Sequence, residues 1–142
     1  SVAGLRGPVL ATPGCMSVQY ELDGTVTIEA ELLLQELRSG REVVIVDVRT
    51  APEFEAGHIP GSRLIPLHQL VARTCELETH RADPVVLVSR HGTRARLADV
   101  ALRVAGFGEV AVLAGGFRRW RDLGYPVEDR SMTSRRMPPR PA

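Results

Sequence analysis

The residues that could do chemistry in this sequence are gathered in one short segment, residues 89–94, which reads Ser-Arg-His-Gly-Thr-Arg. An apolar run at residues 84–88 comes directly before it, and a helical pattern follows it. A tight loop that leads into a helix turns several backbone N–H groups toward one point, and the helix dipole adds partial positive charge there. Arg90 and Arg94 add two full charges, and Gly92 permits a backbone conformation that a side chain would block. The segment therefore predicts an anion-binding cradle with residue 89 at its floor.

The side chain at position 89 decides which chemistry such a cradle could support. A cysteine thiol has a pKa of about 8.5, and a helix N-terminus with nearby cations lowers it toward about 3.5–7.5. A serine hydroxyl is not ionised by such a site near neutral pH. The cradle therefore suits a thiolate, whereas this chain carries Ser89. A serine-hydrolase role is disfavoured, because the sequence positions no base and the surrounding Val-Ser-Arg-His lacks the Gly-x-Ser-x-Gly pattern.

The elements that must position this segment alternate along the chain. Short runs rich in β-branched residues predict strands buried on both faces at residues 43–46, 85–88 and 110–113, with weaker candidates at 25–28 and 63–65. Apolar residues at helical spacing predict helices at 30–37 and 97–104, and shorter ones at 66–75 and 117–123. The alternation predicts an α/β fold with a central parallel five-stranded sheet and helices on both faces. In such sheets ligands bind at the carboxyl ends of the strands, where residues 89–94 lie.

Three motifs give this pattern a family resemblance. Residues 89–94 resemble the active-site loop Cys-Arg-x-Gly-x-Arg of the rhodanese (thiosulfate sulfurtransferase) family, with serine in the first slot. Upstream, a set of residues resembles the family's first signature: Asp47-Val48-Arg49, Glu53-Phe54 and the Gly-His-Ile-Pro-Gly-Ser of residues 57–62. Downstream, its second signature is resembled by Gly115-Gly116-Phe117 with Trp120. The matches occur in the family's order, so the resemblance implies a rhodanese-like domain of the single-domain type.

The resemblance implies a chemistry for the cradle. In the family, a cysteine takes the sulfane sulfur of thiosulfate or a persulfide donor, becomes a persulfide, and passes the sulfur to a thiophilic acceptor such as cyanide or a thiol. Ser89 stands at the position of that nucleophile, and the resemblance implies donor binding by Arg90, His91, Gly92, Thr93 and Arg94. The related dual-specificity phosphatases use a loop one residue longer, so six residues imply sulfur rather than phosphate ester substrates. We expect the Ser89 chain to be inactive but to bind a small anion.

Other polar residues of the motifs are expected to support the loop. Asp47 ends a buried strand and is expected to order the loop through hydrogen bonds or a salt bridge, with Arg49 as its neighbour. His58 could be a general base, but the glycines and proline around it favour a structural turn. His91 could shape donor choice or be a solvated loop residue. Trp120 is expected to pack in the core or at its rim.

Neither cysteine replaces residue 89. Cys75 ends a predicted helix and is expected to be a buried structural cysteine, and Cys15 lies in the N-terminal arm. Two isolated cysteines do not make a disulfide framework, so we expect a reducing cytoplasm. The four histidines are scattered without ligand spacing, so we expect no metal site and no cofactor.

The bulk properties of the 142-residue chain argue against several partners. Its net charge of +1 provides no overall field for nucleic acid. No apolar run approaches the roughly 18 residues that span a bilayer, and no signal peptide pattern is visible. Composition predicts an N-terminal arm or linker at 1–24, in which residues 19–22 could pair with another segment, the rhodanese-like domain at 25–128 and a basic disordered tail at 129–142. The arm and tail are compatible with a fused or partner sulfur-metabolism protein.

Two hypotheses for function stay open. The first is a sulfurtransferase whose nucleophile has been replaced by serine, which is nearly isosteric with cysteine. The second is a naturally non-catalytic rhodanese-like module that serves in binding or regulation. The loop retains Arg90, Gly92 and Arg94, which favours the first hypothesis, although an anion-binding module would retain them too.

Overall fold

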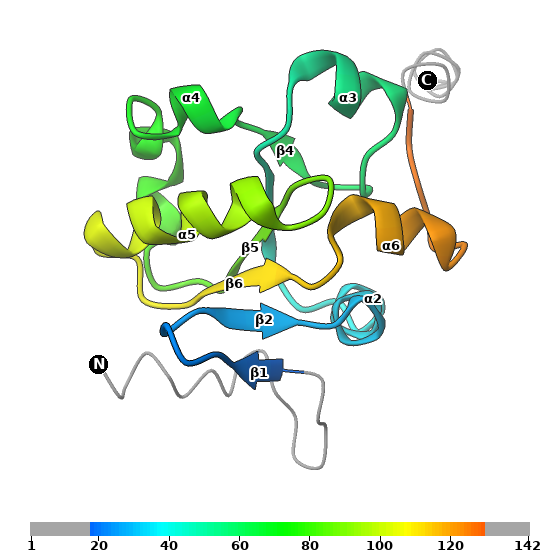
Figure 1. The fold of residues 1–142 in the computed structure, drawn as a ribbon, viewed down its shortest axis with the longest axis horizontal. Helices are drawn as coiled ribbons and strands as arrows, with labels where there is room; N and C mark the ends of the chain where they lie inside the picture. Colours follow the sequence, from blue (N-terminus) through cyan, green and yellow to red (C-terminus); the bar gives the residue numbers. More distant parts are fainter. Residues whose placement is uncertain (1–17, 130–142) are drawn as a thin grey trace, which may run out of the picture.

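The computed structural model describes residues 18–129, and Figure 1 shows how its elements are arranged. Most of the predicted arm at 1–24 and nearly all of the predicted tail at 129–142 lie outside the described residues. Within the described part, none of the helices is long and apolar enough to cross a membrane.

One sheet forms the centre of the domain, with its strands in the order β1-β2-β6-β5-β3-β4. The strands are β1 (Val18–Tyr20), β2 (Val26–Ile28), β3 (Val44–Asp47), β4 (Arg63–Leu64), β5 (Val85–Val88) and β6 (Val110–Leu113). The five strands from β2 to β4 in this order are parallel, as predicted. The three strongest apolar runs of the sequence lie side by side as β6, β5 and β3, where burial on both faces is most complete.

The structure corrects the number of strands from five to six. β1 is an additional edge strand that runs antiparallel to β2, with Val18 opposite Ile28 and Tyr20 opposite Val26. It therefore belongs to the sheet although it lies within the segment predicted as an arm. The strand has only three residues, and Gln19 and Tyr20 are exposed, so it lacks the buried apolar run that identifies the other strands.

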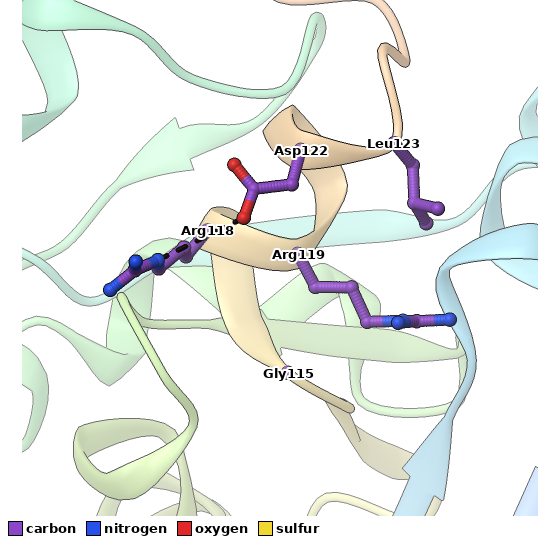
Figure 2. A pocket seen from close by; sticks show the side chains of 5 residues that line it. All are labelled: Gly115, Arg118, Arg119, Asp122 and Leu123. Carbon is purple, nitrogen blue, oxygen red and sulfur yellow. Dashed lines mark ion pairs between the residues drawn. The ribbon is translucent and has the colours of Figure 1, made fainter.

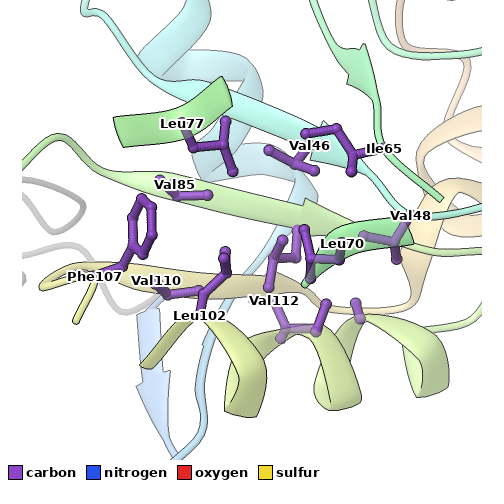
Figure 3. Packing of buried hydrophobic residues seen from close by; sticks show 13 residues of the cluster. Val46, Val48, Ile65, Leu70, Leu77, Val85, Leu102, Phe107, Val110 and Val112 are labelled. Carbon is purple, nitrogen blue, oxygen red and sulfur yellow. The ribbon is translucent and has the colours of Figure 1, made fainter. Parts of the chain in front are cut away.

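Helices cover both faces of the sheet, and each face has its own hydrophobic core. On one face lie α2 (Ala30–Arg38) and α6 (Gly116–Asp122), and on the other lie α4 (Leu67–Leu70), the 3-10 helix η1 (Thr74–His80) and α5 (Thr93–Val104). Figure 3 shows the second core, in which Val85 of β5 lies near Phe107 and Leu102. Alternate residues of β5 enter opposite cores, as expected for a strand covered on both faces. The short helix α3 (Ala51–Ala56) follows β3 and buries none of its residues.

Helix α5 forms where the spacing of apolar residues predicts a helix. The apolar residues on which that prediction rests, however, do not lie on the buried face of the helix. Leu97, Val100 and Val104 are 60%, 53% and 84% exposed. The side chains that α5 buries are instead Ala95, Ala98, Asp99 and Leu102. Two of these are alanines, whose small size lets a helix pack close to a sheet. Apolar spacing thus identifies the helix correctly without identifying the side that faces the core.

Candidate active site

Ser89 lies at the floor of the loop between β5 and α5, at the carboxyl edge of the sheet. Ser89 is only 1% exposed, and its Oγ accepts a hydrogen bond from the backbone N–H of Gly92 at 2.9 Å. Gly92 precedes the first residue of α5 and has φ of +111°, a conformation that side chains with a Cβ rarely adopt. The loop therefore curls around the side chain at position 89, and the N-terminus of the 12-residue helix α5 adjoins it.

The start of α6 holds the carbonyl groups of this loop. The N–H of Phe117 donates to the carbonyl oxygen of Ser89 at 2.8 Å, and the N–H of Arg118 donates to that of Arg90 at 3.2 Å. Gly116 has φ of +64°, and a Cβ at this position would overlap both carbonyl oxygens. Two acceptors that would otherwise repel an anion are therefore satisfied by α6, and the loop backbone is fixed by a neighbouring element.

Arg94 has a carboxylate partner that comes from α3. Its Nη1 and Nη2 donate to Oε1 and Oε2 of Glu53 at 2.9 and 3.1 Å. The hydrogen bonds from Arg94 lower the pKa of Glu53 to about 2, so the carboxylate is charged at neutral pH. Glu53 also accepts hydrogen bonds from the N–H and the hydroxyl of Thr50. The N–H of Glu53 donates to Thr50 Oγ1 in return, so the two residues form the capping box that begins α3. The guanidinium assigned to the donor from the sequence thus has an internal partner.

Asp47 and Arg49 form a buried ion pair beside the loop. Asp47 ends β3 opposite Val88, and Arg49 donates to both of its carboxylate oxygens, with Nη2–Oδ2 at 2.8 Å. Arg49 also donates to the carbonyl oxygen of Gly57 at 2.7 Å, and its guanidinium lies 4.4 Å from the centroid of the Phe117 ring. The pair therefore connects β3 with the end of α3 and with α6, and its charges are already compensated.

His58 makes its contacts outside the loop. Its ring stacks on that of Phe54 with centroids 3.7 Å apart, and its Nδ1 donates to the carbonyl oxygen of Phe54 at 2.7 Å. Its Nε2 lies 3.7 Å from a carboxylate oxygen of Glu128, and the backbones of His58 and Glu128 pair as a bridge. These contacts fix the turn after α3 to the end of the domain, which is a structural arrangement rather than that of a general base.

The other predicted loop residues lie on the surface. Arg90, His91 and Thr93 are exposed, and Arg90 forms no ion pair within residues 18–129. Trp120, in contrast, is fully buried, and its Nε1 donates to the carbonyl oxygen of Pro126 at 2.7 Å. The loop therefore offers an exposed cation at its mouth, while the tryptophan is part of the core.

The cysteine in the described part of the chain differs from the sequence expectation. The helix expected at 66–75 is divided into α4 and η1, and Cys75 lies in η1 with an exposed side chain rather than a buried one. Cys15 lies outside the described residues. Among residues 18–129, no group of three or more His, Cys, Asp or Glu side chains is placed to hold a metal ion.

A shallow depression of about 270 Å³ lies on the outer side of α6, as shown in Figure 2. It is lined by Gly115, Arg118, Arg119, Asp122 and Leu123. Arg118 lies 3.8 Å from Asp122, and Arg119 lies 3.4 Å from Glu31 of α2. Because both guanidinium groups have carboxylate partners and no residue of the 89–94 loop lines the depression, it is distinct from the candidate site.

Two residues that shape the loop are absent from the site predicted from the sequence. Glu53 carries a local signal, since Thr-x-x-Glu at residues 50–53 is the capping-box pattern, but that pattern predicts only a helix start. Gly116 belongs to a Gly-Gly pair that indicates an unusual backbone, without indicating what it contacts. Their contacts with Arg94 and with the loop carbonyls depend on the tertiary structure.

Together these features define an α/β domain with a helix-capped loop at the carboxyl edge of a parallel sheet. The chain belongs to the rhodanese-like domain family, whose model matches residues 29–123. It is 35% identical over 100 residues to a protein of Allochromatium vinosum named sulfurtransferase, covering 70% of this chain and 92% of that protein. It is 37% identical over 95 residues to the thiosulfate sulfurtransferase GlpE of Pseudomonas putida strain GB-1, covering 66% of this chain and 82% of that protein.

A solved structure gives the same assignment. The solution structure of the rhodanese-like domain of the Anabaena protein Alr3790 matches with a TM-score of 0.68 and 28% identity, covering 82% of this chain and 86% of that chain. The family that the motifs resemble and the α/β fold class predicted from the alternating elements are therefore confirmed, with six strands in place of five.

Proposed function

We infer that the loop is the donor site of a rhodanese-type sulfurtransferase, with residue 89 at the position of the sulfur-carrying cysteine. The observation that carries this inference is the buried position of the Ser89 side chain in a loop that is closed by Gly92 and followed by a helix N-terminus. Relatives named sulfurtransferase and thiosulfate sulfurtransferase support the same reaction class.

The chemistry of this site requires a thiolate at position 89. Such a thiolate attacks the outer sulfur of thiosulfate, the S–S bond of the donor breaks, and sulfite leaves with the bonding electrons. The enzyme then carries Cys–S–S⁻, whose outer sulfur is taken by cyanide or a thiolate with return of the thiolate. The helix N-terminus and the exposed Arg90 favour the anionic forms of cysteine and persulfide at this position.

The Ser89 hydroxyl cannot take part in this cycle, because it is not ionised and cannot carry a sulfane sulfur as a persulfide. The chain with Ser89 therefore binds an anionic donor in the loop without reacting with it. The Ser89 Oγ accepts a hydrogen bond from the N–H of Gly92 at 2.9 Å. In a cysteine form, the larger thiolate sulfur would accept this hydrogen bond in place of the hydroxyl oxygen.

The test is to replace the serine by cysteine. We expect Ser89→Cys to form thiocyanate from thiosulfate and cyanide at least about 10³-fold faster than the Ser89 chain, because a nucleophile is restored. Mass spectrometry of the thiosulfate-treated variant should show a mass gain of one sulfur atom. A Ser89→Cys variant that stays inert with thiosulfate and with a low-molecular-weight persulfide contradicts the enzyme assignment.

Two controls separate residue 89 from other causes. Cys75→Ser in the Ser89→Cys background should keep the activity, because Cys75 is an exposed thiol of η1 outside the loop. Ser89→Ala should remain inert while it still binds thiosulfate. Loss of activity on removal of Cys75 would mean that Cys75 takes part in the sulfur transfer, and would contradict the assignment of the sulfur carrier to residue 89.

A second candidate function is a non-catalytic module that binds an anion or a partner through this loop. It is favoured by the hydrogen bond between Ser89 and Gly92, since the serine is fully accommodated in the loop. This candidate predicts anion binding by the Ser89 chain and no turnover after the cysteine is introduced. A fused or partner sulfur-metabolism protein and a cytoplasmic location are further predictions under either function.

A further inference from the structure

The pairing of Arg94 with Glu53 changes the charge that the loop presents to a sulfur donor. Both terminal nitrogens of the Arg94 guanidinium are engaged by carboxylate oxygens, so this cation is neutralised within the site. The buried pair of Asp47 and Arg49 is neutral as well. Arg90 is then the loop cation without an ion pair among the described residues. The side chains therefore give the loop one net positive charge, in addition to the partial charge at the start of α5.

Glu53 is a fixed counter-ion rather than a mobile surface carboxylate. Its Oε1 accepts hydrogen bonds from Thr50 N and Thr50 Oγ1 at 2.9 and 3.0 Å while both oxygens hold Arg94. Its side chain is 28% exposed, so water screens the pair only in part. An incoming anion that displaces Glu53 must break this network, and an anion that leaves it in place meets its negative charge.

We propose that Glu53 is a specificity-determining residue that favours singly charged sulfur donors, of the hydropersulfide class R–S–S⁻, over dianionic thiosulfate. The inference rests on the proposed function for its reaction, but it concerns binding, which the Ser89 chain can report. The energy of an anion in the field of Glu53 is proportional to the anion's charge. If the charge of Glu53 lowers the binding affinity for a monoanion by a given factor, it lowers the affinity for a dianion of the same shape by the square of that factor.

Thiosulfate and methanethiosulfonate are a matched pair of probes for this rule. The second replaces one charged oxygen by a methyl group and keeps the outer sulfur, so its charge is one unit smaller. Each would be titrated calorimetrically into the Ser89 chain and its Glu53→Gln variant. Glutamine preserves a capping-box acceptor for Thr50 and removes the charge. We expect Glu53→Gln to raise the binding affinity for methanethiosulfonate roughly threefold and that for thiosulfate roughly tenfold.

Two further variants separate charge from structure. Thr50→Ala removes the hydroxyl that holds Glu53 but keeps the charge, so the affinity ratio of the two probes should not change. Arg94→Gln alone leaves Glu53 uncompensated and should weaken thiosulfate more than methanethiosulfonate. The double variant Glu53→Gln/Arg94→Gln removes a neutral pair, so both probes should bind within about twofold of the starting chain. Circular dichroism of each variant verifies that the fold is retained.

The outcomes decide the proposal. An equal gain for the two probes in Glu53→Gln, or no gain, overturns it. A double variant that binds as weakly as Arg94→Gln alone overturns it too, because Arg94 would then contact the anion directly. Failure of the proposed function is a separate result, in which Ser89→Cys is inert while the binding ratio still shifts. If neither probe binds any variant, the loop is not an anion site and both proposals fall.

Discussion

At the scale of single residues, the loop is shaped by a glycine outside it as much as by its own side chains. Gly116 lies where a Cβ would overlap the carbonyl oxygens of Ser89 and Arg90, and its φ of +64° is itself unfavourable for other residues. The close approach allows Phe117 and Arg118 to donate their N–H groups to those carbonyls. The geometry around position 89 therefore depends on the backbone of α6.

Gly116→Ala should destabilise the domain and disturb the loop. We expect it to lower the free energy of unfolding by about 3 kcal/mol, because the left-handed conformation and the overlap with two carbonyls both oppose the methyl group. Thiosulfate binding should weaken by at least about tenfold as the loop moves. Gly40→Ala is the matched control, since Gly40 has φ of +82° but open space around its Cβ position. It should cost about 1 kcal/mol and leave binding unchanged.

At the scale of the elements, α5 has two roles that its sequence does not separate. Its N-terminus adjoins Ser89, and Ala95, Ala98 and Leu102 pack it against the sheet. The apolar residues Leu97, Val100 and Val104 lie on the solvent side of the helix. The burial pattern, rather than hydrophobicity, thus shows which α5 side chains stabilise the domain.

This arrangement predicts effects of very different size on stability for two leucines of the same helix. Leu97→Ala should change the free energy of unfolding by less than about 0.5 kcal/mol, because Leu97 is 60% exposed. Leu102→Ala should cost about 2–5 kcal/mol, because Leu102 is fully buried in the second core and the change leaves a cavity. Urea unfolding of the two variants measures both values. Similar costs for the two would mean that the outer side of α5 is covered.

At the scale of the whole molecule, charge pairs join elements that are far apart in the chain. Glu53 of α3 and Arg94 of α5 are separated by 41 positions, and their pair connects α3 with the first turn of α5. Because the pKa of Glu53 is lowered from 4.5 to about 2 in the folded state, ionised Glu53 stabilises the fold. This contribution is fully present above the unfolded pKa and is lost as pH falls through the folded one.

The stability difference between the chain and Glu53→Gln should therefore depend on pH. At pH 7 we expect the chain to be more stable by about 1–2 kcal/mol, after allowance for solvent screening of the partly exposed pair. The difference should shrink between about pH 5 and pH 2, since protonated glutamate resembles glutamine. Denaturant unfolding at pH 7, 4 and 2.5 measures it. A difference that does not change with pH would place the stabilisation in the hydrogen bonds and not in the charge.

The sequence by itself determines the parallel strands of the sheet, the loop and the family. The runs at β3, β5 and β6, the glycine before α5 and the order of the three motifs are local patterns, and local patterns suffice to place Ser89 at a strand end before a helix. The edge strand β1 is not identified by the same reasoning, because it has only three residues and the side chains of Gln19 and Tyr20 are exposed.

Only the tertiary structure decides which groups meet at the loop. With 18 basic and 17 acidic residues in the chain, sequence spacing cannot select Glu53 as the partner of Arg94. The choice depends on where the end of β3 brings α3 relative to the start of α5. In the same way, the contact of Gly116 with the loop arises because β5 and β6 are neighbours in the sheet. The charge available to a donor is therefore a property of the fold, since ion pairing depends on distances that the sequence does not contain.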